Sequence, residues 1–170
     1  MMLKWIGAGI VFAGCGAFGY SIAAAYMHEI RGLKNLIKVI DYIECELRYR
    51  QLPLAVLCRR SSAVCAGEVS KVMTMIAQEL ENQVLPDVSS CIRTATKQVK
   101  YMPFSWTKIF RSLESCLGVY DLENQLKMLL AVRNECQMEL DDITFNQKNR
   151  VHSYQVLGLC VGAAIAILFV

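Results

Sequence analysis

The chain has 170 residues, of which 55% are hydrophobic and 19% charged, with a formal net charge of +3. It is too apolar for an ordinary soluble domain, and its balanced charge argues against a nucleic-acid partner. We find no phosphate-binding glycine loop, nucleophile elbow or metal-ligand spacing, so the sequence predicts no enzyme, cofactor or metal site.

The first predicted element is an uncharged apolar block over residues 5–26. A helix of that length spans a hydrocarbon core of roughly 30 Å, which predicts an N-terminal transmembrane helix. The sequence FAGC, which ends at Cys15, also resembles a lipoprotein cleavage site. A small lipoprotein anchored at Cys15 is therefore an alternative, although apolar residues continue beyond Cys15 and favour an uncleaved anchor.

Residues 28–153 hold all 15 acidic residues and every basic residue except Lys4. Apolar residues recur three or four apart from Ile30 to Leu47, which predicts that the first helix continues to about Gln51. Leu52, Pro53 and Leu54 then form a corner, because proline disfavours helix before it but suits the first turn of the next helix. A short second helix follows.

Three more helices and a long last one complete the middle of the chain. A third helix carries Val69 to Leu80, and a fourth follows Pro86. Ser105 is the predicted N-cap of a fifth helix, which stops at Gly118. Asp121 caps a last helix without proline or glycine before Gly158. We expect an all-α, membrane-tethered bundle of about six helices.

A second apolar block covers residues 154–170 and is at the short end of the spanning range. Basic residues flank both blocks on their inner sides, so residues 28–153 should be cytoplasmic and both termini outside. Small residues repeat every four positions in both blocks, which favours close helix packing in lipid. The two apolar blocks could pack against each other or against other subunits, including further copies of this chain. These residues are Gly9, Ala13, Ala17, Ser21 and Ala25, then Gly158, Gly162 and Ala166.

Charged residues gather on both sides of the proline corner. They are Glu44, Glu46, Arg48, Arg50, Arg59 and Arg60. They could form a docking surface for an acidic partner or an ordinary solvated surface. The cysteines between the apolar blocks are dispersed, which predicts small, reduced core residues with no disulfide or metal role.

Two short motifs carry a resemblance to a family. Glu46-Leu47-x-Tyr49 followed by Pro53-Leu54 resembles the first hallmark of stage III sporulation protein AB from endospore-forming bacteria. Leu117-Gly118-x-x-Asp121-x-x-x-Gln125 resembles the second. The family often has glycine where Arg50 stands, and a small residue where Leu57 stands.

The resemblance implies a role. Such proteins are similar to the cytoplasmic module of the inner-membrane platform protein of type II secretion and type IV pilus machines. It implies a non-catalytic subunit of a secretion-like channel complex in the mother-cell membrane around the forespore. The implied partners are a cytoplasmic secretion-type ATPase, other membrane and ring-forming channel components, and lipid.

The resemblance also implies roles for the motif residues. Pro53, Leu54 and Gly118 would shape turns, whereas Tyr49, Asp121 and Gln125 would lock helix ends or meet a partner. A membrane-anchored signalling or scaffold module is the alternative function.

Overall fold

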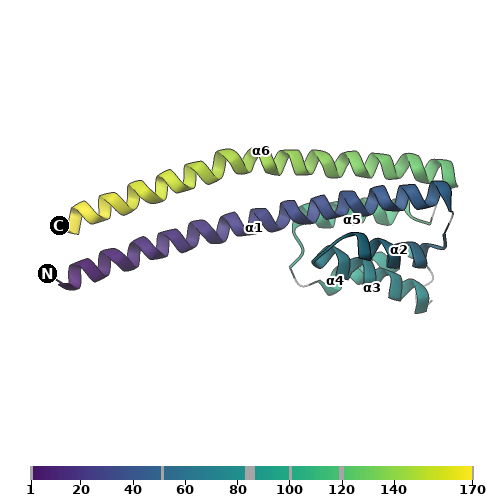
Figure 1. The fold of residues 1–170 in the computed structure, drawn as a ribbon, viewed down its shortest axis with the longest axis horizontal. Helices are drawn as coiled ribbons and strands as arrows, with labels where there is room; N and C mark the ends of the chain where they lie inside the picture. The colour runs from purple at the N-terminus through teal and green to yellow at the C-terminus, as the bar shows by residue number, and fades with distance from the viewer. Residues whose placement is uncertain (1, 51, 83–86, 100, 119–120, 170) are drawn as a thin grey trace. The chain divides into compact units, whose positions relative to one another are not determined.

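The computed structural model describes the backbone of residues 2–50, 52–82, 87–99, 101–118 and 121–169. Side chains are described for residue 14 and for residues 20–146 outside the gaps in those ranges. The described residues form six α-helices and no strand, which confirms the predicted all-α class (Figure 1). The helices are α1 (Met2–Tyr49), α2 (Leu54–Val64), α3 (Glu68–Asn82), α4 (Val88–Gln98), α5 (Phe104–Cys116) and α6 (Leu122–Phe169).

The chain divides into two compact units. One comprises residues 29–141, which we call the bundle, and the other comprises the chain before residue 29 and after residue 141. The bundle contains α2 to α5 whole, together with the second part of α1 and the first part of α6. The predicted limits at residues 5–26, 28–153 and 154–170 were drawn from hydropathy and remain predictions.

Helix α1 runs along the core of the bundle and contributes buried residues over its whole length there. Of the predicted apolar positions, Ile37 is half-buried and the others are buried, as expected: Ile30, Leu33, Ile40 and Leu47. Three further α1 residues are fully buried although the sequence pattern did not single them out: Leu36, Val39 and Ile43. The apolar face of α1 is wider than one stripe because several helices pack around it.

Two contacts fix α1 and α6 as antiparallel neighbours within the bundle. The Arg133 guanidinium donates to the Asp41 carboxylate at 2.5 Å, and the Cys136 thiol lies 3.6 Å from the carbonyl oxygen of Leu33. Residue numbers therefore rise along α6 as they fall along α1.

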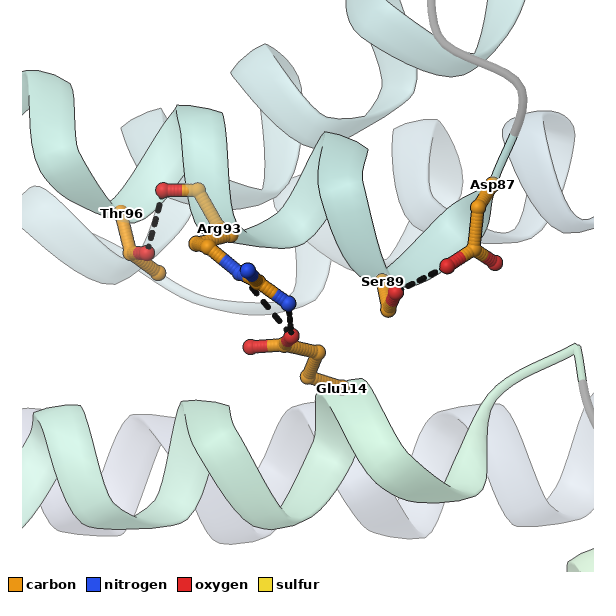
Figure 2. A network of polar contacts seen from close by, with 5 residues as sticks. All are labelled: Asp87, Ser89, Arg93, Thr96 and Glu114. Carbon is orange, nitrogen blue, oxygen red and sulfur yellow. Dashed lines mark hydrogen bonds and ion pairs between the residues drawn. The ribbon is translucent and has the colours of Figure 1, made fainter.

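The shorter helices pack in chain order, α2 on α3, α3 on α4 and α4 on α5. Figure 2 shows the polar link between α4 and α5, in which Arg93 donates to one oxygen of Glu114 from Nε at 3.2 Å and Nη2 at 2.6 Å. At the start of α4, the Ser89 hydroxyl donates to the Asp87 carboxylate, and this bond lowers the pKa of Asp87.

The start of α5 differs from the prediction. Ser105 is not the N-cap, because Pro103 precedes the helix with φ −56° and Phe104 is its first residue. The Ser105 hydroxyl instead donates to Oε1 of Glu29 on α1, 2.6 Å away. The Ser105 hydroxyl therefore bonds to a residue 76 positions away in the chain, and not to the backbone at the start of its own helix.

No helical segment among the residues with described placement is both long and apolar enough to cross a membrane. The predicted terminal spans stay a prediction. Most of the predicted membrane-packing residues lie outside the described side chains, as does Cys15: Gly9, Ala13, Ala17, Gly158, Gly162 and Ala166. Of that set, Ser21 and Ala25 are described, and both are exposed.

Candidate functional site

The first motif forms the corner between α1 and α2. The last turn of α1 closes with a bond from the Arg50 N–H to the Glu46 carbonyl at 2.8 Å. Pro53 follows with φ −54° and ψ 139°, and its carbonyl accepts the N–H of Leu57 at 3.0 Å. Leu54 is half-buried and Leu57 fully buried. The corner is therefore the proline-led turn that the sequence predicts.

The second motif forms the corner between α5 and α6. Gly118 has φ +81°, a left-handed conformation that glycine adopts without strain. A Cβ added to Gly118 would lie 2.8 Å from Cγ2 of Val88, so the site also requires a residue without a side chain. The predicted stop at Gly118 is confirmed, because α5 ends at Cys116, two residues before it.

Asp121 stands directly before α6, at the predicted cap position. Its carbonyl accepts the N–H of Gln125 at 2.9 Å, and its carboxylate accepts a bond from Nδ2 of Asn124 at 2.7 Å. A carboxylate at this position stabilises a helix start through the unpaired N–H groups and the helix dipole.

The antiparallel pairing of α1 and α6 brings the two motifs together. Because Asp41 faces Arg133 and Leu33 faces Cys136, Gln125 lies level with the last turns of α1. Figure 1 shows both corners at the same end of the bundle. We call this the motif end; it comprises Glu46, Tyr49, Pro53, Leu54, Gly118, Asp121 and Gln125. It lies about 30 Å from Glu29 along α1, at 1.5 Å per residue.

The side chains of the motif end divide into internal and exposed ones. Gln125 is only 9% exposed, so it belongs to the interior. Tyr49 is 77% exposed, next to a shallow hollow of about 220 Å³ that Asp41, Glu44 and Arg48 also line. The sequence left open whether Tyr49, Asp121 and Gln125 lock helix ends or meet a partner. Tyr49 and Asp121 are both exposed, so both remain available to a partner, whereas Gln125 is buried.

Glu46 is unusual within the motif end. Its Oε2 is buried and accepts no hydrogen bond from the described residues. The other carboxylate oxygen lies 3.9 Å from the Arg50 guanidinium, which is a long ion pair. An unsatisfied buried carboxylate oxygen costs free energy of folding, and because it is buried it is not open to a donor from another molecule.

The charges predicted as a docking surface are mostly paired. Arg48 binds Glu44 at 2.8 Å, and Arg50 lies near Glu46. Arg59 binds both carboxylate oxygens of Glu81 on α3, and this bond raises the pKa of Arg59. Arg60 is exposed on α2. These residues do not form one free cationic surface, because three of the four arginines have acidic neighbours.

Most of the described cysteines are core residues, as predicted. Cys58, Cys91, Cys116 and Cys136 are buried, whereas Cys45 is exposed and Cys65 half-buried. Burial raises the pKa of Cys58 to about 12 and of Cys116 to about 11. Burial, with smaller contributions from Glu139 and Glu135, raises the pKa of Cys136 to about 12. Such thiols stay protonated and poorly nucleophilic.

Comparison with known proteins identifies the family. The sequence profile described as stage III sporulation protein AB matches residues 4–170. The chain belongs to the stage III sporulation protein AB family. Membership confirms the resemblance carried by the two motifs and is consistent with a role in sporulation.

A solved structure described as stage III sporulation protein AB has the same fold. It superposes with a TM-score of 0.65 at 18% sequence identity, over 72% of this chain and 98% of the other. A search of curated protein sequences finds no match. No group of three or more histidine, cysteine, aspartate or glutamate residues that could hold a metal ion occurs in the described part of the chain.

Proposed function

We propose that this protein is a non-catalytic platform subunit of a secretion-like channel complex between mother cell and forespore. In this role it couples a cytoplasmic secretion-type ATPase to membrane and ring-forming components. Membership in a stage III sporulation family supports the process. The observation that carries the mechanism is the convergence of both family motifs at one end of a helical bundle.

The proposed membrane anchors are the apolar blocks over residues 5–26 and 154–170, with the bundle on the cytoplasmic side of the mother-cell membrane. Their length, lack of formal charge and basic inner flanks support this placement. Each block belongs to a helix of 48 residues that also forms part of the bundle. One helix thus links the proposed lipid-embedded segment to the bundle at each end of the chain.

The proposed ATPase contact is the motif end. Tyr49 offers a large, exposed aromatic surface, and tyrosine is among the residues that contribute most to binding at interfaces. If the ATPase binds two states of the bundle with different affinity, its cycle can drive a change there, and equal affinity would make the subunit a static support.

Co-purification tests this contact with a matched pair of variants. The full chain is expressed with the ATPase and captured as Tyr49→Ala or Tyr101→Ala. Tyr101 is a suitable control because it is 81% exposed, against 77% for Tyr49, and belongs to the opposite end of the bundle. We expect loss of the ATPase with Tyr49→Ala only. Equal retention by both variants contradicts a contact at Tyr49, and absence of the ATPase from the unaltered chain contradicts the proposed role.

Cysteine labelling in intact cells tests the orientation. Cys45 is the suitable probe because it is exposed, whereas Cys58 and Cys91 are buried and would react slowly on either side. An impermeant maleimide should leave Cys45 unmodified until the membrane is permeabilised. Labelling of Cys45 in sealed cells would reverse the orientation and remove the basis for an ATPase contact.

A further inference from the structure

The end of the bundle opposite the motif end carries two exposed aromatic residues. Tyr101 is 81% exposed and Phe104 is 84% exposed, at the connection from α4 to α5. They are more exposed than any other large hydrophobic residue in the described part of the chain. We call this pair the aromatic corner. Exposed aromatic surface of this kind marks an interaction site more often than a single exposed aliphatic residue does.

The position of the aromatic corner is fixed by contacts to the first residue of the bundle. Ser105 and Trp106, which follow Phe104, both bind Glu29, the Ser105 hydroxyl to its carboxylate and the Trp106 indole N–H to its carbonyl at 3.0 Å. Glu29 follows the apolar block over residues 5–26 by three residues on the same helix, about 4.5 Å along the axis. The aromatic corner is therefore held against the first turn of α1 within the bundle.

Two cations lie on the helices that meet at the aromatic corner. Lys97 is four residues before Tyr101, and Arg111 is seven residues after Phe104, about 10 Å along α5. Lys97 and Arg111 are exposed and line one cleft of about 450 Å³ between α4 and α5. Within the described residues neither has an acidic partner, whereas Arg93 in the same cleft is bound to Glu114 (Figure 2). Arg31, two residues after Glu29, is also exposed. The Glu29 carboxylate also lies at this end of the bundle, where it accepts the Ser105 hydroxyl.

We propose that the aromatic corner is a second membrane contact, in which Tyr101 and Phe104 enter the headgroup region of an anionic bilayer while Lys97 and Arg111 face its phosphates. Tyrosine favours the membrane–water interface, and phenylalanine supplies apolar area just below it. Each cation near an anionic leaflet adds attraction that falls off within a Debye length. Together with α1, this contact would fix the tilt of the bundle against the membrane. The inference rests on the membrane anchoring proposed above.

Fluorescence quenching in vesicles tests the contact with the full chain. In a Trp5→Phe background, Tyr101→Trp and Tyr49→Trp place a reporter at each end of the bundle, and the background alone supplies the Trp106 signal. Each protein is reconstituted into phosphatidylcholine–phosphatidylglycerol vesicles with brominated acyl chains. We expect quenching of Tyr101→Trp at least twofold stronger than that of Tyr49→Trp, with emission at shorter wavelength than in detergent.

The outcomes separate this inference from the proposed anchoring. If the protein floats with vesicles but Tyr101→Trp is quenched no more than Tyr49→Trp, the aromatic corner does not touch lipid and the anchoring stands. If the protein does not float, the anchoring fails and the inference with it.

The role of the cations has its own test. In a Lys97→Gln and Arg111→Gln variant of the Tyr101→Trp reporter, the extra quenching in anionic over neutral phosphatidylcholine vesicles should disappear. Unchanged preference for anionic vesicles would remove Lys97 and Arg111 from the contact.

Discussion

The two ends of the bundle are built in different ways. At the motif end, Pro53 and Gly118 set backbone angles that turn the chain, and the bonds near them are mostly local. At the opposite end, Glu29 is held by Ser105 and Trp106 from more than 70 positions away. The comparison shows that one bundle can rely on turn chemistry at one end and on tertiary packing at the other. These sources of stability respond to different substitutions.

The largest expected effect is at Gly32, which tests the packed end. A Cβ on Gly32 would lie 1.6 Å from Cζ2 of Trp106, and Trp106 is only 2% exposed, so neither group has room to move. We expect Gly32→Ala to lower the free energy of unfolding by about 3 kcal/mol, as for severe overpacking. Gly14→Ala is the control, because nothing lies within 4 Å of a Cβ there. Equal unfolding midpoints in urea for the two variants would show that Trp106 is not fixed.

The next effect is at Gly118, which tests the motif end. Gly118→Ala combines a left-handed φ with the clash against Val88, so we expect a loss of about 2 kcal/mol. Gly67→Ala is the matched control, because it has φ +72° and nothing within 4 Å of a Cβ, and should lose about 1 kcal/mol. Adding Val88→Ala to Gly118→Ala should reduce the part of the stability loss that comes from the steric clash with Val88. Chemical denaturation measures the free energy of unfolding of each variant. Equal losses of stability at Gly118 and Gly67 would show that the contact with Val88 does not contribute.

A smaller effect concerns the core between the two ends. Burial raises the pKa of Cys58 from 9.0 to about 12, so the folded state keeps a proton that the unfolded state releases. Stability from this thiol is full below about pH 9 and is lost as the pH rises toward 12, by up to about 1.4 kcal/mol per pH unit. Cys58→Ala should flatten the fall in urea midpoint between pH 8 and pH 10. An unchanged slope would show that Cys58 ionises in the folded state.

The smallest effect is expected on the exposed seam of α1 and α6. Asp41 and Arg133 have side chains 47% and 38% exposed, so solvent screens their attraction. A double-mutant cycle with Asp41→Asn and Arg133→Gln should give a coupling of about 0.5 kcal/mol that weakens in high salt. A coupling above about 2 kcal/mol would show that this ion pair, and not the buried apolar contacts, contributes most to the packing of α1 against α6.

The sequence by itself determined the elements that depend on local physics. Proline at residue 53 and glycine at residue 118 have few backbone options, and the helical spacing of apolar residues follows from the pitch of the helix. The all-α class, the order of the helices, both corners and the family could therefore be predicted. The sequence predicted both motifs of the candidate site, but it did not predict that they lie at the same end of the bundle.

Only the tertiary structure decided which distant groups meet. The fold buries Leu36, Val39 and Ile43. It pairs Ser105 with Glu29, and Arg59 with Glu81. It also places both motifs at one end of the bundle. A side chain with several local options is assigned by its partner in the fold, and the sequence does not record the pairing. Partners distant in the chain become neighbours only when the apolar faces have packed.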